Sequence, residues 1–344
     1  MRGILDYSQR FGDCRVAVVG DFMLDEYVWG HIDRISPEAP VPILNVVRRE
    51  TALGGAGNVV RNLCAIGIKV TAIGIVGDDR AGTRVRNLIE DLGVDAGNII
   101  CDRERNSTRK VRLMSLEHGQ QVFRVDQETV QPVRQEIEDK LVSQIVDASF
   151  RPDVILCSDY LKGVLTDRVL RSSFDAARLQ GIPALVAPKG SESKRYEGAT
   201  VLMPNQKELA QLTQTSIDGN SWLANSAGKL IEKLGLQALI VTRGKDGMSL
   251  FETKSQGTHR VDIPTMARTV YDVTGAGDTA ISVFAGMIAA GANLEAAVYA
   301  ANLAGGIKVA KRGTNTVTLE EIYEHLSERH GSSVALSNAQ VASQ

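Results

Sequence analysis

The chain has 344 residues, of which 43% are hydrophobic and 23% are charged, and its formal net charge is −2. This length allows a large buried core, built either as one α/β domain or as a domain with a smaller appendage. The balanced charge offers no basic field for nucleic acid, and no stretch approaches the roughly 18 apolar residues of a membrane span.

The four cysteines, Cys14, Cys64, Cys101 and Cys157, show no CxxC spacing and no pairing with histidine. They lie among apolar residues, so we expect reduced packing residues and not a disulfide framework or a metal site. The start of the chain lacks the long apolar segment of a secretory signal. We therefore expect a cytoplasmic protein without a nucleic-acid or membrane partner.

Short apolar runs that end in Gly, Asp, Asn or Lys recur along the chain and predict buried parallel strands. Helical patterns at 80–92, 135–148 and 167–180 separate several of them. This alternation predicts an α/β fold with a doubly wound, mostly parallel sheet flanked by helices. Ligands of such sheets bind beyond the carboxyl ends of the strands, so the closing residues are site candidates. The expected strands lie at 15–21, 69–79, 153–159, 183–190, 200–205 and 238–244.

Two segments interrupt the alternation. Residues 26–50 contain three prolines, Pro37, Pro40 and Pro42, which exclude a helix and disfavour a central strand. Residues 107–128 alternate polar and apolar side chains around a His-Gly turn, as a hairpin does. We expect the two segments to form a small inserted antiparallel β lid. The rest of residues 1–331 then forms one domain, and residues 332–344 a flexible tail.

The sequence TGAGD, residues 274–278, precedes a helical run of small residues. Glycines at the start of a helix can place backbone N–H groups around an anion, and the helix dipole adds positive charge. Neither a Walker A loop nor a GxGxxG fingerprint occurs. The motif can be a plain helix start with Asp278 as a cap. Alternatively, Asp278 is a general base that accepts a proton from an attacking hydroxyl beside a bound phosphoryl group.

A second glycine cluster, LGGAGN at 53–58, also opens a helix. Its glycines serve either tight helix packing or a ligand. Asp21 and Asp25 follow the first strand, and with Asn58 they would suit hydrogen bonds to several hydroxyl groups, as a sugar requires.

A third cluster, MPNQKE, places Asn205 and Glu208 three residues apart at the start of a helix. The two residues form either a capping pair or a site that holds Mg²⁺ through water. The sequence VTRGKDG at 241–247 ends a strand in a glycine turn that is placed to line a nucleotide.

Together, LGGAGNVVRNLCAIG, NQKE, VTRGKDG and DVTGAGDTAISVF resemble the ribokinase-like (PfkB-type) carbohydrate kinases over nearly the whole chain. The resemblance implies a kinase that uses ATP and Mg²⁺, with K⁺ as an open possibility, and a homodimer formed through the lid. It implies Asp278 as catalytic base, the amides of Gly275, Ala276 and Gly277 as anion hole, and Asn205 and Glu208 as organisers of Mg²⁺. The implied nucleotide residues are also Thr242, Gly244, Gly247 and Asn302, and the sugar residues are Asp21, Asp25, Gly54, Gly55 and Asn58.

The sequences RISPEAPVPIL, SDYLKG, PKG and KRGTNTVT look like the heptose 7-phosphate kinase branch of this family. That branch phosphorylates the anomeric hydroxyl of D-glycero-D-manno-heptose 7-phosphate, giving the 1,7-bisphosphate, a precursor of ADP-heptose and the lipopolysaccharide core. Many of its members carry a fused nucleotidyltransferase domain, and here we expect the kinase alone. One departure is Ala187, which stands where the branch usually has Asp before PKG.

Five cations are candidates for binding the phosphate of such a substrate, because guanidinium and ammonium groups suit a phosphate dianion. Each of them can also be an ordinary surface charge. They are Arg34, Arg109, Lys110, Lys162 and Lys189.

Two alternatives to a heptose 7-phosphate kinase stay open, and a third is disfavoured. The acceptor can instead be fructose 6-phosphate, ribose or a nucleoside, and the lid then determines which of these acceptors is bound. A non-catalytic sugar-phosphate sensor remains open because of Ala187. A dinucleotide oxidoreductase is disfavoured, because the first strand ends in GDFMLDEY and not in a glycine fingerprint.

Overall fold

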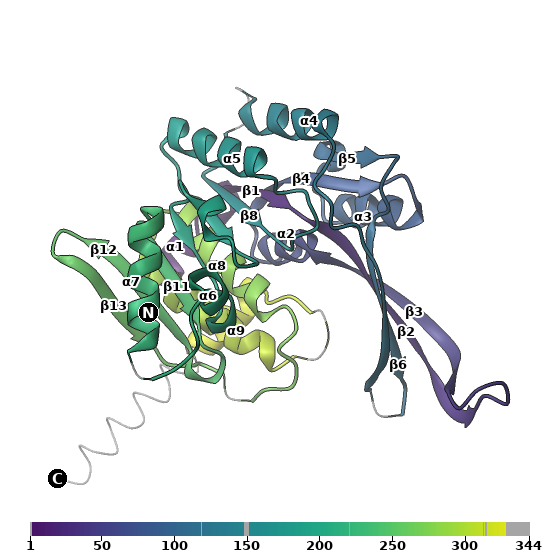
Figure 1. The fold of residues 1–344 in the computed structure, drawn as a ribbon. Helices are drawn as coiled ribbons and strands as arrows, with labels where there is room; N and C mark the ends of the chain where they lie inside the picture. Colours follow the sequence, from purple (N-terminus) through teal and green to yellow (C-terminus); the bar gives the residue numbers. More distant parts are fainter. Residues whose placement is uncertain are drawn as a thin grey trace, which may run out of the picture.

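The computed structural model describes residues 2–117, 119–147, 151–219, 221–267, 269–311, 313 and 315–327. An α/β body surrounds a nine-stranded sheet, and a second, four-stranded sheet extends away from it (Figure 1). The helices are α1 (Arg2–Ser8), α2 (Ala56–Ala65), α3 (Arg80–Glu90), α4 (Gln135–Val146), α5 (Asp167–Gln180), α6 (Gln206–Thr213), α7 (Trp222–Leu234), α8 (Ala276–Ala289) and α9 (Leu294–Val309).

The large sheet has the order β13-β12-β11-β10-β9-β8-β1-β4-β5. The strands from β11 to β5 pair in parallel, while β12 and β13 add an antiparallel edge. This confirms the predicted α/β fold with a mostly parallel sheet. Its strands are β1 (Arg15–Gly20), β4 (Lys69–Gly77), β5 (Ile99–Asp102), β8 (Val154–Ser158), β9 (Ala184–Ala187), β10 (Val201–Leu202), β11 (Ala238–Thr242), β12 (Met248–Lys254) and β13 (Gly257–Ile263).

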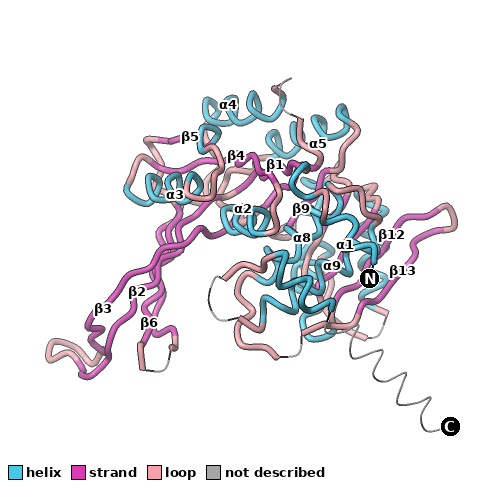
Figure 2. The backbone as a smooth tube through the Cα atoms, turned by 180° about the vertical axis from the view of Figure 1, so that it is seen from behind, coloured by secondary structure: helices cyan, strands magenta, loops and turns pink. Residues whose placement is uncertain are grey.

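Helices cover both faces of this sheet (Figure 2). Along β1, Val16 and Val18 pack into one hydrophobic core, with side chains of α2, α3, α8 and α9. Ala17 and Val19 point to the other face and pack into a second core, with side chains of α4, α5, α6 and α7. The alternation follows from the two-residue period of a strand, and it explains why these strands are continuous apolar runs in the sequence.

The two segments that were predicted as a lid form the four-stranded sheet, which we call the lid, and its order is β3-β2-β6-β7. Strands β2 (Phe22–Ile35) and β3 (Pro42–Gly55) form one antiparallel pair, and β6 (Thr108–Ser115) and β7 (Gln121–Gln127) form another. The central β2–β6 pair is parallel, so the lid is mixed and not purely antiparallel as predicted. The first lid segment also runs several residues beyond the predicted 26–50 at both ends.

Local patterns located most body elements to within a few residues, and α5 has the predicted bounds of 167–180. The sequence reasoning missed β5, β12 and β13, which lie at the two edges of the large sheet. β5 and β13 are the edge strands and are partly exposed, while β12 is buried only over its first four residues, so none of the three shows the continuous apolar run of a central strand. The predicted tail at 332–344 lies outside the described residues.

The four cysteines form no disulfide; Cys14 and Cys157 are buried, while Cys101 is exposed and so is not a packing residue. Within the described part of the chain, no helix has the length and apolar character needed to cross a membrane.

Candidate active site

The carboxylate of Asp278 lies in the first turn of α8 and accepts two side-chain hydrogen bonds. The Asn58 amide donates to its Oδ2 at 2.7 Å, and the Tyr160 hydroxyl donates to its Oδ1 at 2.6 Å. Burial raises the pKa of Asp278, while these two donors and the nearby Lys189 ammonium act to lower it. The result is an oriented carboxylate with a raised pKa, which suits a group that accepts a proton.

The turn that leads into α8 presents backbone N–H groups beside this carboxylate. Gly275 is the N-cap residue and has a φ of 74°, which favours glycine. Ala276 N–H donates to Val273 O at 3.2 Å, so it closes the turn, contrary to the expectation of three available amides. The N–H groups of Gly275 and Gly277 make no hydrogen bond to any residue that the structure describes. These two amides and the helix dipole therefore form the candidate anion site.

A buried lysine ties this turn to the segment that follows α9. Lys308 is 2% exposed, and its Nζ donates to Gly313 O at 2.7 Å. Gly313 N–H in turn donates to Asp272 Oδ2 at 3.0 Å, and Thr274 N–H donates to Asp272 Oδ1 at 2.9 Å. Burial lowers the pKa of Lys308, and the charge of Asp272 partly restores it. Since Lys308 Cε lies 3.9 Å from where a Cβ on Gly275 would be, the lysine side chain passes close to the anion turn and brings its positive charge near it.

A cavity of about 240 Å³ adjoins Asp278, and its wall includes Tyr160, Lys189, Asn205 and Glu208. Asn205 and Glu208 form the capping box of α6: Glu208 N–H donates to Asn205 Oδ1 at 3.0 Å, and Asn205 N–H donates to Glu208 Oε2 at 2.8 Å. Lys189 Nζ donates to the other oxygen of Glu208 and lies 5.8 Å from the centre of the Tyr160 ring. The capping pair is thus also part of the cavity that contains Asp278.

The fit of this cavity to Mg²⁺ follows from its donor groups. Among the described residues, no three His, Cys, Asp or Glu side chains cluster so as to hold a metal ion. Glu208 has both oxygens engaged by Asn205 and Lys189, and Ala187 lines the cavity without adding a ligand. The residues fit an ion that is held mainly by phosphate oxygens and reaches Glu208 through water.

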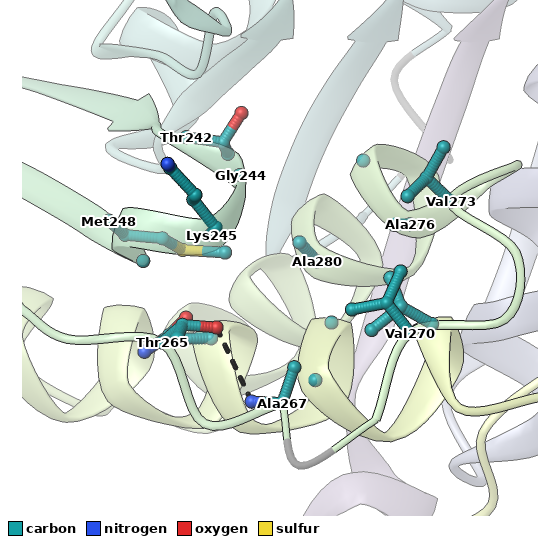
Figure 3. A pocket seen from close by; sticks show the side chains of 16 residues that line it. Thr242, Gly244, Lys245, Met248, Thr265, Ala267, Val270, Val273, Ala276 and Ala280 are labelled. Carbon is teal, nitrogen blue, oxygen red and sulfur yellow. Dashed lines mark hydrogen bonds between the residues drawn. The ribbon is translucent and has the colours of Figure 1, made fainter.

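A larger pocket of about 440 Å³ opens on the other side of the α8 N-terminus (Figure 3). The side chains drawn there are mostly small or apolar, and its described lining contains no Asp or Glu. Such walls suit the flat face of a nucleotide base. Thr242 and Gly277 line both this pocket and the cavity beside Asp278, so the two are adjacent. The four predicted nucleotide residues Thr242, Gly244, Gly247 and Asn302 all line the pocket.

Asp21 is buried, and both of its oxygens accept backbone N–H groups of the segment that follows β8. Tyr160 N–H and Lys162 N–H donate to Oδ2 at 2.8 and 3.1 Å, and Val164 N–H donates to Oδ1 at 3.2 Å. Burial and the charge of Asp159 raise the pKa of Asp21 to about 6, against the effect of these amides. Asp21 thereby positions Tyr160, a site residue that sequence reasoning missed although it lies in the motif SDYLKG. Its predicted contact with a sugar remains a prediction.

Asp25, Gly54 and Gly55 come together where the lid joins the body. A Cβ on Gly54 would lie 2.8 Å from Asp25 Oδ2, and Gly55 has a φ of 57°, so both positions favour glycine. Asp25 Oδ1 accepts a hydrogen bond from Arg112 Nη1 at 2.7 Å. Asp25 is close enough to Asp278 for its charge to raise the pKa of that carboxyl, so this end of the lid faces the candidate base.

Strand register divides the lid into an inner face toward Asp278 and an outer face away from it. Asp25 pairs with Lys110, and Tyr27 with Arg112, so these four residues share the inner face. Arg109 points the opposite way and pairs with Glu26 at 2.6 Å on the outer face. The prediction of Arg109 and Lys110 as joint phosphate ligands is therefore wrong for Arg109, because adjacent residues of a strand point to opposite faces.

The other predicted phosphate ligands are mostly neutralised by carboxylates. Lys110 and Lys162 both contact Glu128, at 3.3 and 3.0 Å, and Lys189 contacts Glu208. Arg34 lies nine positions beyond Asp25 along β2, about 30 Å at the usual rise of a strand. The structure thus brings Lys110, Lys162 and Lys189 to the site, and it places Arg34 next to the last residue of β2, far from Asp25.

The sequence pattern of the pfkB family of carbohydrate kinases matches residues 14–322. The "Bifunctional protein HldE" of Geotalea uraniireducens is 44% identical over 326 residues, which cover 95% of this chain and 66% of that protein. The chain thus spans about two thirds of the length of this relative.

Two solved structures share the fold. A ribokinase from Arabidopsis thaliana, complexed with ribose and ATP, aligns with a TM-score of 0.70 at 20% identity and covers 91% of this chain and 98% of its own. The phosphofructokinase-2 from Escherichia coli, in complex with potassium, aligns with a TM-score of 0.76 at 18% identity and covers 92% and 98%.

Proposed function

This chain belongs to the pfkB family of carbohydrate kinases, and we propose that it transfers the γ-phosphoryl group of ATP to the anomeric hydroxyl of D-glycero-D-manno-heptose 7-phosphate. The observation that carries the proposal is the position of Asp278. Its oriented carboxylate lies between the nucleotide pocket and the polar cavity, beside the two available amides of the α8 N-terminus. Base and anion site are thus within one helical turn of each other.

In the proposed reaction Asp278 accepts the proton of the attacking hydroxyl. The raised pKa of Asp278 lies closer to neutral pH, where a general base is most effective. The two hydrogen bonds to the carboxylate fix the direction of its oxygens. As the new O–P bond forms at the acceptor oxygen, the proton passes to Asp278, and the O–P bond to ADP breaks. Asn58 and Tyr160 hold the base in place during this transfer.

In this proposal the transferred phosphoryl group is bound by backbone amides of the turn that carries Asp278. The Gly275 and Gly277 amides donate to the phosphoryl oxygens, and the Lys308 ammonium adds positive charge near the turn. Lys189 lines the same cavity, and its ammonium can leave Glu208 to bind a phosphate oxygen. Mg²⁺, when bound to the nucleotide, would neutralise phosphate charge, with Asn205 and Glu208 as its contacts through water.

Two observations support the heptose acceptor. The sequences RISPEAPVPIL, SDYLKG, PKG and KRGTNTVT resemble the heptose 7-phosphate kinase branch, and Tyr160 of SDYLKG contacts the candidate base. The second support is the likeness to the protein named HldE. The product would be a 1,7-bisphosphate on the route to ADP-heptose and the lipopolysaccharide core. The alternative acceptors are fructose 6-phosphate, ribose and nucleosides.

The cofactors, the assembly and the compartment belong to the same proposal. The use of ATP is supported by the family and by the pocket, and that of Mg²⁺ by the cavity with Asn205 and Glu208, while a requirement for K⁺ is open to test. A homodimer through the lid is supported by its exposed apolar side chains. Phe123 is 63% exposed and Val125 49%, and both lie on the outer face, opposite Leu113 and Val111. We place the enzyme in the cytoplasm, where ATP is available.

The test is an acceptor panel in which ADP release is measured with heptose 7-phosphate, fructose 6-phosphate, ribose and a nucleoside. We expect the highest kcat/KM for heptose 7-phosphate. Phosphorus NMR of the product should then show a phosphate on C1. A clear preference for an unphosphorylated sugar would refute the heptose proposal, and tight sugar-phosphate binding without ADP release from any acceptor would favour the sensor alternative.

A further inference from the structure

One cation beside the site differs from those that sequence reasoning selected. Arg61 lies on α2, three residues after Asn58, and it is half-buried. Its Nη1 is buried, and none of the described residues gives that nitrogen a hydrogen-bond partner. Leaving a buried charged donor unsatisfied is costly, so such a group calls for an explanation, and a missing ligand supplies one.

The surroundings of Arg61 belong to the inner face of the lid. Asp25 and Tyr27 are its close electrostatic neighbours, and Arg61 is also near enough to Lys308 for its charge to lower the pKa of that ammonium. Arg112 approaches the same two lid residues: it donates to Asp25 Oδ1 at 2.7 Å, and its guanidinium lies 5.2 Å from the centre of the Tyr27 ring. Arg61 and Arg112 are therefore both neighbours of Asp25, so two guanidinium groups lie near this one carboxylate.

We propose that Arg61, assisted by Arg112, binds the phosphate that the acceptor sugar itself carries. A phosphate monoester dianion accepts several hydrogen bonds from guanidinium forks, and it would supply the partner that Arg61 Nη1 lacks. The inference rests on the proposed function. It names the residues that bind the phosphate at one end of the acceptor sugar, while the hydroxyl at the other end reacts beside Asp278.

The spacing along α2 agrees with this assignment. Asn58 contacts Asp278, and Arg61 starts about 4.5 Å further along the helix axis, to which its own long side chain adds reach. The separation between Asp278 and Arg61 is therefore on the scale of the distance between the two ends of a sugar phosphate. An unphosphorylated sugar leaves the guanidinium without an anion, so the same residue also selects against it.

The decisive variant is Arg61→Gln, which keeps a polar side chain but removes the charge and the fork. We expect kcat/KM for heptose 7-phosphate to fall about 10- to 100-fold, mainly through KM, as for the loss of a charged hydrogen bond. For unphosphorylated D-glycero-D-manno-heptose, and for ATP, the constants should stay within about twofold. Arg61→Lys should keep part of the preference, because it retains the charge without the fork.

Arg84→Gln is the matched control, because Arg84 is an exposed arginine on α3 that contacts Thr51 on the outer side. It should leave both acceptors unchanged. An equal loss for phosphorylated and unphosphorylated heptose in Arg61→Gln, or no loss at all, would overturn the inference. If the wild type prefers another phosphorylated acceptor, the heptose proposal fails while the Arg61 test proceeds with that sugar phosphate and its dephosphorylated form.

Discussion

The nucleotide pocket and the Asp278 cavity meet at the N-terminus of α8, yet their walls are of opposite kinds. The pocket is lined mostly by glycines and small or apolar side chains, with Lys245 as the one charged group in its described lining, whereas the cavity is lined by Asp159, Tyr160, Lys189, Glu208 and Asp278. The pocket can therefore act mainly by shape. The cavity acts by charge, and each of its ionisable groups already has a partner that must be kept or exchanged.

This difference has consequences for substitution. A change in the cavity should alter turnover and its pH dependence, because it alters the charge or orientation of reacting groups. A change in the pocket should alter the KM for ATP while turnover stays nearly constant. A change on the outer face of the lid should alter neither.

The largest effect is expected for Asp278→Asn, which keeps the shape of the side chain and removes the base. Turnover should fall about 10²- to 10⁴-fold, while nucleotide affinity changes little. Steady-state kinetics together with calorimetric titration of ADP would measure both quantities. Wild-type-like turnover would contradict the role of Asp278 as base. A loss of nucleotide binding would contradict the idea that the pocket and the Asp278 cavity have separate roles.

The next effect concerns Tyr160→Phe, which removes the hydroxyl that donates to Asp278. Turnover should drop about tenfold, as for a lost hydrogen bond to a charged group. That hydrogen bond lowers the pKa of Asp278, so its removal should raise that pKa further. A base works only when deprotonated, so the acid limb of the kcat–pH profile should move to higher pH. An unmoved or downward-shifted limb would argue against the contact.

Lys308→Met tests the buried charge near the anion site. Removing the ammonium leaves Gly313 O without its donor, so the free energy of unfolding should fall by about 1–3 kcal/mol. Turnover should fall by a smaller factor than in Tyr160→Phe, because the Gly275 and Gly277 amides remain. Denaturant unfolding and kinetics over a K⁺ series would measure these effects. Recovery of turnover by K⁺ in the variant alone would indicate that Lys308 supplies a charge that an ion can replace.

Asn302→Ala probes the apolar pocket. The Asn302 amide donates to Pro264 O at 2.7 Å and so holds one wall of the pocket. The KM for ATP should rise about two- to tenfold, as for a lost neutral hydrogen bond, with kcat nearly unchanged. A fall in kcat without a change in KM would show that the pocket also affects the chemistry.

The smallest effect on turnover is expected for Phe123→Ser on the outer face of the lid. It should weaken the proposed dimer by about tenfold or more, as for an apolar interface anchor. Leu179→Ser, at an exposed apolar side chain on α5 and outside the lid, is the matched control. Sedimentation velocity would compare the two variants. If neither changes the association state, the outer face is not the dimer interface.

The sequence by itself identified the local parts of the site. A glycine turn and a helix start are encoded by consecutive residues. The sequence alone therefore predicted that Gly275 and Asp278 lie at the start of a helix. The Asn205–Glu208 capping box was equally predictable, because its two members are one helical turn apart. The predicted nucleotide residues Thr242, Gly244 and Gly247 are likewise close together in the sequence, at the end of β11 and in the turn that follows it.

Only the tertiary structure decided which distant side chains meet these parts. Tyr160 reaches Asp278 because Asp21 holds the segment after β8, and Lys308 reaches the anion turn because α8 and α9 pack together. Arg109 was misassigned because one residue of register separates the inner face of the lid from the outer. Arg61 was overlooked because the sequence does not show that one of its nitrogens is buried without a hydrogen-bond partner among the described residues. Local patterns fix backbone conformation, whereas pairing across the sheet fixes which charges are left for a substrate.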